Sequence, residues 1–173
     1  MKRIFSLLIV LAFFASCETD VTSNTPAFQA RKDNFMWRAQ DYTAVYNPMD
    51  NSLVLSAYKG FEVLTITVGP VNVGGSETGV FFEDATFTLD EDATAFATYS
   101  YVDNGMTFEY STLGQESTTG EIVLENTANQ KMGTISGRWR FDAPYVGDLT
   151  NAPERINFQN GVFYEIPLTF VAE

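Results

Sequence analysis

The stretch GTISGRWRFDA, residues 133–143, alternates between two kinds of side chain. Apolar or small side chains occupy its odd positions, which include Trp139 and Phe141, and polar side chains such as Arg138 and Arg140 occupy the even positions. A period of two residues places successive side chains on opposite faces of a β-strand. The stretch therefore predicts a strand with one buried face and one solvent-facing face.

A second alternating run lies just before this strand. Ile122 and Leu124 alternate with the acidic residues Glu121 and Glu125, and the polar sequence NTANQ at residues 126–130 follows them. Turns are rich in such polar residues, so the two runs predict a β-hairpin.

Similar runs occur along most of the remaining chain. Many of them are rich in Phe, Tyr and β-branched residues, which favour strands. The predicted strands cover residues 27–31, 35–39, 42–46, 52–58, 62–68, 80–82, 85–89, 95–102, 106–110, 155–158 and 162–171. About ten to twelve short strands without a helical pattern predict an all-β protein: a single antiparallel β-sandwich domain, with a closed or partly open, lipocalin-like β-barrel as the alternative.

Turn residues separate these runs. Asp33-Asn34, Asn104-Gly105 and Asn160-Gly161 suit two-residue hairpin turns, because Asn and Gly readily adopt a positive φ. Residues 69–79 hold a Gly-Pro pair and a Gly-Gly-Ser run, which predict a loop with at most a short extended piece. This segment lacks the lysine and the helix of a phosphate-binding loop, so it predicts a connection only.

The first 17 residues have the layout of an export signal. A basic start at residues 1–3 precedes an apolar run at residues 4–14, which is too short to cross a membrane as a helix. The small residues Ala15-Ser16 then precede Cys17, and this ending resembles the lipobox of bacterial lipoproteins. The resemblance implies cleavage before Cys17 and attachment of acyl chains to it, and several acyl chains anchor a protein stably to a bilayer.

Three segments follow from this interpretation. Residues 1–16 form a lipoprotein signal peptide, residues 17–26 form a flexible tether that begins with the lipid-bearing Cys17, and residues 27–173 form the all-β domain. We expect the protein on the outer membrane, at either its periplasmic face or the cell surface. The membrane, reached through the acyl chains on Cys17, is its expected partner.

Composition excludes several kinds of function. The chain has a formal net charge of −12, and removal of Lys2 and Arg3 with the leader makes the remainder −14, which disfavours nucleic acid as a partner. Histidine is absent and Cys17 is the only cysteine, so the domain can form neither a Ser-His-Asp triad nor a Cys/His zinc site. We expect no catalytic residues, no cofactor and no metal, and therefore no enzyme. A glycoside hydrolase with two carboxylates is the least favoured alternative.

Two groups of residues could still bind a ligand. The acidic turns Glu83-Asp84 and Asp90-Glu91-Asp92 could offer oxygens to calcium, but they lack the spacing of an EF-hand loop, which favours solvated turns. Aromatic side chains could form a platform on which sugar rings stack. The candidates for this platform are Trp37, Tyr99, Tyr101, Tyr110 and Trp139, although Trp139 shares the predicted buried face of its strand. The sequence does not choose a ligand-binding residue among them.

The chain also resembles a family of small Bacteroidota lipoproteins of unknown function. The resemblance rests on residues 24–30, the Trp37-Arg38-Ala39 run, the strand pair from residue 120 to residue 143, and residues 157–167. These residues form strands and turns, so the resemblance implies a fold and no activity. We expect a non-catalytic binding or structural module of the cell envelope, whose partner could be a glycan, a small molecule or an envelope protein.

Overall fold

The computed structural model describes residues 27–76, 79–89, 94–116, 118–126 and 131–171, and these residues form strands and connecting turns with no helix. Thirteen strands are present: β1 Ala27–Lys32, β2 Phe35–Arg38, β3 Asp41–Asn47, β4 Ser52–Lys59, β5 Glu62–Val68, β6 Val73–Ser76, β7 Gly79–Phe82, β8 Ala85–Thr88, β9 Ala95–Asp103, β10 Met106–Ser111, β11 Thr119–Leu124, β12 Thr134–Pro144 and β13 Arg155–Phe170. The all-β prediction is confirmed.

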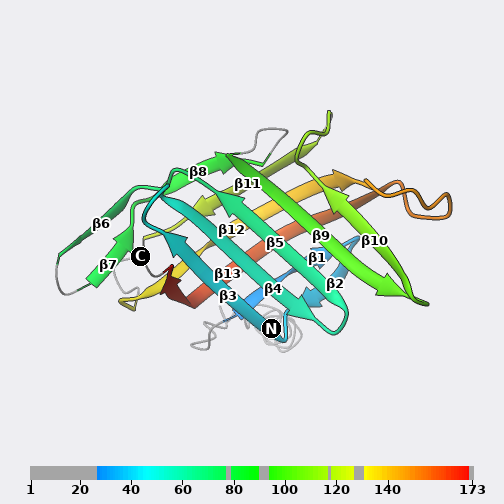
Figure 1. Cartoon of the computed structure of the whole chain (residues 1–173). Coiled ribbons are helices and arrows are strands. Elements are labelled where there is room, and N and C mark those ends of the chain that lie inside the picture. Colours follow the sequence, from blue (N-terminus) through cyan, green and yellow to red (C-terminus); the bar gives the residue numbers. More distant parts are fainter. Residues whose placement is uncertain (1–26, 77–78, 90–93, 117, 127–130, 172–173) are drawn as a thin grey trace, which may run out of the picture.

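Eleven of the strands form one continuous sheet. Its order is β10-β9-β5-β4-β3-β13-β12-β11-β8, while β1 pairs with β13 and β2 pairs with β1. Figure 1 shows this sheet curling into a half-barrel, with the separate β6–β7 hairpin beside one end. The arrangement corresponds to the partly open barrel that the sequence left as the alternative to a sandwich.

One strand pair departs from the antiparallel pattern. The last residues of β13, Leu168–Phe170, pair in parallel with Ala44–Tyr46 of β3, so the sheet is mixed. The parallel contact is possible because β13 is 16 residues long. Its middle part, from Phe158 to Tyr164, pairs with β1 and its end reaches β3, while β12 runs along its other side.

The Asn160-Gly161 turn was predicted wrongly. Asn160 does adopt a positive φ of 50°, but β13 continues through it with an irregularity in the register instead of reversing. Gly161 then faces inward, where a Cβ atom would overlap the ring of Trp139. Asn160-Gly161 is a residue pair that suits a turn, but in this chain it forms a bulge that leaves room for the Trp139 ring.

The other short turns follow their prediction more closely. Asp33 and Asn34 adopt φ values of 47° and 70° between β1 and β2, and Asn104 and Gly105 adopt 50° and 78° between β9 and β10. Part of the predicted loop at residues 69–79 is instead the extended strand β6, which pairs with β7. Glycine has no side chain, but its backbone still forms hydrogen bonds. A Gly-rich run can therefore serve as one strand of a hairpin.

Aromatic rings fill the concave side of the sheet. Phe28, Trp139 and Phe158 are buried, with ring centroids 5.5 Å apart for Phe28 and Trp139 and 5.3 Å apart for Trp139 and Phe158. Such separations are favourable for aromatic pairs, and each buried ring contributes roughly 1.5–3 kcal/mol through loss of apolar surface. Gly137 lets β12 approach its neighbours, since a Cβ there would overlap Val123 and Phe163.

Candidate functional site

A polar cluster interrupts this aromatic core at one end of the half-barrel. We call Lys32, Trp37, Lys59, Glu62 and Tyr99 the mouth cluster. Five strands bring them together: Lys32 ends β1, Trp37 lies in β2, Lys59 ends β4, Glu62 begins β5 and Tyr99 lies in β9. Glu62 faces inward because it is in phase with the buried residues of β5.

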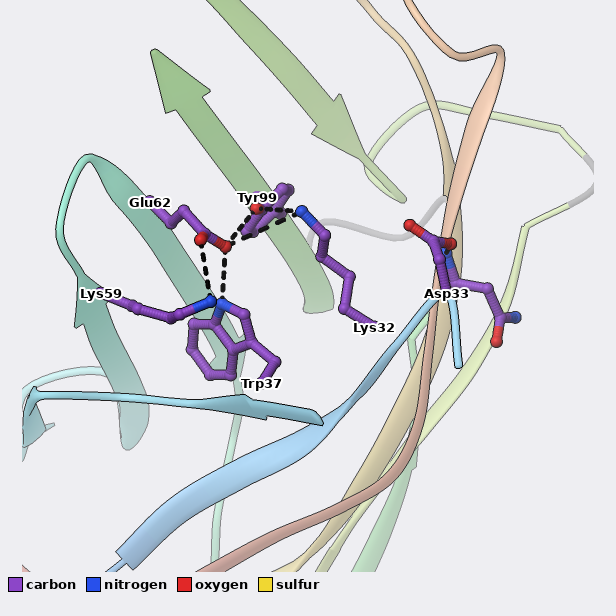
Figure 2. Close-up of polar contacts among 7 residues, drawn as sticks. Lys32, Asp33, Trp37, Lys59, Glu62 and Tyr99 are labelled. Atoms are coloured by element: carbon purple, nitrogen blue, oxygen red, sulfur yellow. Dashed lines mark hydrogen bonds and ion pairs between the residues drawn. The ribbon is translucent and has the colours of Figure 1, made fainter. Parts of the chain in front are cut away.

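The Glu62 carboxylate is the centre of the mouth cluster, as Figure 2 shows. Its Oε2 atom accepts hydrogen bonds from the Trp37 indole at 2.7 Å and from the Tyr99 hydroxyl at 2.6 Å. Its Oε1 atom accepts a hydrogen bond from the Lys59 ammonium at 3.1 Å. Three donors on three different strands thus hold one carboxylate in a fixed position.

Lys32 approaches the same carboxylate from β1. Its Nζ atom donates a hydrogen bond of 2.7 Å to the Tyr99 hydroxyl oxygen and lies 3.8 Å from Glu62 Oε2. It also lies 4.7 Å from the ring centroid of Tyr99 and 5.2 Å from that of Tyr101. Both distances allow a cation–π interaction.

Burial and pairing have opposite effects on the pKa values of Glu62 and Lys32, whereas both raise the pKa of Tyr99. Burial alone raises the pKa of Glu62, but hydrogen bonds from Tyr99, Lys59 and Trp37 outweigh it and lower that pKa. Burial lowers the pKa of Lys32, against the opposing effect of the Glu62 charge. Burial and the hydrogen bond to Glu62 raise the pKa of Tyr99 far above its usual value of 10.0. Glu62 is therefore ionised and Tyr99 neutral at physiological pH.

The mouth cluster opens into a pocket of about 470 Å³. Besides Lys32, Lys59, Glu62 and Tyr99, its walls include Gln40, Phe61, Tyr101 and Asp103. Phe61 and Tyr101 offer ring faces, whereas Gln40 and Asp103 offer hydrogen-bonding groups. Because its two lysines face two carboxylates, the pocket is balanced in charge. Such a pocket suits a small polar ligand with one apolar face.

The aromatic residues that could form a sugar-binding platform do not make an exposed surface. Trp37, Tyr99, Tyr110 and Trp139 are each buried, so they cannot stack on a ligand from solvent. Tyr101 alone is partly exposed and lines the pocket. The structure brings Trp37, Tyr99 and Tyr101 together at the mouth, and Tyr110 contacts both tyrosines. Trp139 instead packs inside the sheet between Phe28 and Phe158.

Only one of the two acidic turns lies among the described residues. Glu83 and Asp84 are exposed, and Asp84 accepts a hydrogen bond from the backbone N–H of Asn126 at 2.6 Å. Asp90-Glu91-Asp92 and the lipidation residue Cys17 lie outside the described residues. Within the described ranges, no group of three or more His, Cys, Asp and Glu side chains could hold a metal ion.

Sequence reasoning missed Lys32, Lys59 and Glu62. One signal was available, because Glu62 shares its alternation with Leu64, Ile66 and Val68, which puts a carboxylate on a buried face. A buried carboxylate needs hydrogen-bonding partners. Nothing in the sequence showed that Lys32 and Trp37 would supply them, since β1 and β2 reach Glu62 only when the sheet curls.

The outer face of the sheet has a different charge pattern. We call three ion pairs on β11, β12 and β13 the outer ladder: Arg138–Glu125, Arg140–Glu121 and Arg155–Asp142. A hollow of about 320 Å³ lies among its side chains. The arginine charges are paired with carboxylates of the same surface, so the outer ladder offers no uncompensated cation.

Comparisons with known proteins give a family but no activity. In the part of the chain that the structure describes, no helix is long and apolar enough to cross a membrane. Neither the curated proteins nor the solved structures give a significant match. A family model described as "Domain of unknown function (DUF6252)" matches residues 24–167, from just before β1 to within β13. Because this match covers most of the chain, the protein belongs to the DUF6252 family.

Proposed function

We propose that the protein is a lipid-anchored, non-catalytic binding module of the cell envelope, and that the pocket at the mouth cluster binds a small, uncharged polar ligand such as a sugar. The observation on which this depends is the polar cluster itself. A hydrogen-bonded carboxylate and two ammonium groups lie at the open end of an otherwise aromatic interior, beside a pocket of about 470 Å³. Ligand sites are common at the mouths of β-barrels.

The anchor is supported by the sequence of the leader. A basic start, a short apolar run and small residues before Cys17 match the layout of a lipoprotein signal. The outer membrane remains the proposed location. Labelling cells with radioactive palmitate tests this part: we expect the wild-type chain to take up label and the Cys17→Ser variant to take up none. Equal labelling of both chains would contradict the anchor.

The ligand class is supported by the charge balance of the pocket. Lys59 and Lys32 are already directed at Glu62, so a charged ligand would have to break an existing pair. An uncharged ligand can instead hydrogen-bond to the N–H groups of both lysines that do not bond the cluster and to Gln40, and it can place an apolar face on Phe61 or Tyr101.

The absence of catalysis is supported by the roles of these ionisable groups. The lowered pKa of Glu62 makes it a weak base, and the raised pKa of Tyr99 makes it a weak acid at neutral pH. General acid–base catalysis works best with a pKa near the working pH. The mouth cluster is therefore suited to holding a ligand in place, not to transferring its protons.

Calorimetric titration against a panel of neutral, acidic and basic saccharides tests the binding proposal. We expect saturable binding of a neutral saccharide, and roughly tenfold weaker binding by Phe61→Ala, a loss of about 1.4 kcal/mol. Phe61 is exposed, so this change leaves the core intact. Met49→Ala is the matched control, because Met49 is exposed but lies outside the pocket. Absence of saturable binding, or equal affinity of Phe61→Ala and wild type, would contradict the proposed ligand site.

A further inference from the structure

The β1–β2 hairpin exposes two consecutive apolar side chains at its tip. Phe35 is 79% exposed and Met36 is 68% exposed, directly after the Asp33-Asn34 turn. No described residue covers them, and β2 is an edge strand that pairs only with β1. Large apolar side chains at the tip of an edge hairpin are a surface without a partner.

Two arginines accompany this apolar tip. In the antiparallel register Arg31 lies opposite Met36, and Arg38 lies two residues beyond Met36 on the same face of β2. Met36 is thus flanked by one guanidinium across the hairpin and by another along it. Both arginines are exposed, and both carry a permanent charge.

These arginines also differ from the other arginines that the structure describes. Arg138, Arg140 and Arg155 each form an ion pair with a carboxylate of the outer ladder. Within the described residues, neither Arg31 nor Arg38 forms an ion pair. In a chain whose net charge after the leader is −14, the two unpaired arginines therefore lie on the one hairpin that exposes adjacent Phe and Met side chains.

We infer that the β1–β2 hairpin docks on the lipid bilayer, with Phe35 and Met36 among the headgroups and Arg31 and Arg38 on lipid phosphates. Apolar side chains with adjacent cations are typical of surfaces that lie at a membrane interface. Guanidinium groups match phosphate in geometry and charge. A protein partner with the same chemistry would need an acidic apolar groove, whereas every phospholipid offers a phosphate above an apolar layer.

The length of the chain before β1 permits this contact. The inference rests on the proposed anchor at Cys17. Residues 17–26 span up to about 33 Å when extended, and the six residues of β1 span about 20 Å. The tether is thus longer than the hairpin, so the hairpin tip and the acyl chains can reach the same bilayer.

An environment-sensitive fluorophore on the full lipidated protein tests the inference. We would introduce one new cysteine in each of three variants, Met36→Cys, Met49→Cys and Met132→Cys, label it, and add vesicles of phosphatidylethanolamine with a minor fraction of phosphatidylglycerol. Met49 and Met132 are matched controls, because they are 75% and 64% exposed and Met36 is 68% exposed. We expect a several-fold rise and a blue shift of emission at position 36 only. Co-sedimentation with the vesicles measures the anchor separately.

The outcomes separate the inference from the proposed anchor. Anchored protein with the same emission at all three positions would overturn docking and leave the anchor intact. If the chain with its native Cys17 is found to carry no acyl chains, and position 36 still responds to excess vesicles, docking would be supported and the anchor contradicted.

The charge requirement is tested in the labelled Met36→Cys background. The double change Arg31→Gln, Arg38→Gln should abolish most of the response, whereas Arg138→Gln, Arg140→Gln should leave it unchanged. Circular dichroism shows whether each variant is folded. Equal responses of the two double variants would rule out phosphate recognition by the hairpin.

Discussion

The mouth cluster and the outer ladder both contain ion pairs, but the surroundings of these pairs differ. At the mouth, the side chain of Glu62 is 23% exposed and accepts hydrogen bonds from Trp37, Tyr99 and Lys59. On the outer face, Arg138 and Arg140 are each 66% exposed, and water solvates most of each side chain. Exposed ion pairs contribute about 0–1 kcal/mol, whereas removal of one partner from a half-buried cluster leaves the others without compensation.

The difference shows that the number of ion pairs does not indicate where charge matters to this fold. The outer ladder neutralises the polar face of a strand whose other face is already fixed by Trp139 and Phe141. The mouth cluster, in contrast, links β1, β2, β4, β5 and β9 through a single carboxylate. Loss of that carboxylate should loosen contacts between strands that do not all pair with one another.

Glu62→Gln should have the largest effect on stability. We expect the free energy of unfolding to fall by about 1–3 kcal/mol, because Lys59 and Lys32 lose their charged partner while Trp37 and Tyr99 keep only a neutral acceptor. Denaturant unfolding followed by circular dichroism measures the change.

Glu121→Gln is the matched control for this change, since it removes the partner of Arg140 from the outer ladder. We expect it to cost less than about 1 kcal/mol. If the two variants lose the same stability, the distinction between the two regions is wrong.

Alkaline pH should affect the mouth before it affects the outer ladder. The pKa of Tyr99 in the folded chain is above its unfolded value of 10.0, so its contribution to stability is complete below pH 10 and is lost as the pH rises further. The pKa of Lys32 is lowered in the folded chain, so this group adds stability as the pH rises towards its unfolded pKa of 10.5 and partly offsets the loss at Tyr99. The loss should therefore be clearest above pH 10.5.

Tyr99→Phe isolates this effect. The variant should be less stable at neutral pH, because Lys32 and Glu62 each lose a hydrogen bond. It should nevertheless show a shallower decline above pH 10.5, where Tyr110, whose pKa is also raised by burial, still contributes. Parallel pH profiles of variant and wild type would contradict the assigned role of Tyr99.

Arg140→Ala should have the smallest effect. Its pair with Glu121 is exposed and screened by salt, so we expect a change below about 0.5 kcal/mol that disappears in concentrated sodium chloride. Thermal unfolding at low and high salt measures it. A larger loss that persists in salt would show that the outer ladder holds β11 to β12.

Much of the fold was predictable because alternation is a local property. Residues 133–143 gave the two faces of β12, and Asn104-Gly105 gave the turn between β9 and β10, as the structure confirms. The Asn160-Gly161 pair misled because the same backbone preference serves a bulge as well as a turn. Only the position of Trp139 beneath Gly161 distinguishes the two, and that contact joins different strands.

The mouth cluster was far less predictable. Tyr99 and Trp37 are candidates for an aromatic platform in the sequence, whereas in the structure their rings are buried and their polar atoms donate hydrogen bonds to Glu62. Lys32 is 30 positions before Glu62 and 67 before Tyr99, so their contact depends on how the whole sheet curls. Periodicity states which face a residue occupies, but it does not state which residues meet on that face.

The pairing of the first strand with the last one constrains how the protein can be made. β1 pairs with β13, and β3 also requires the final residues of β13 as its neighbour. A chain that emerges from the ribosome with its N-terminus first cannot complete the half-barrel until its last 16-residue strand has been synthesised. The nascent polypeptide therefore leaves β1 and β3 without this neighbour until β13 has been synthesised, so closure of the half-barrel follows the synthesis of β13.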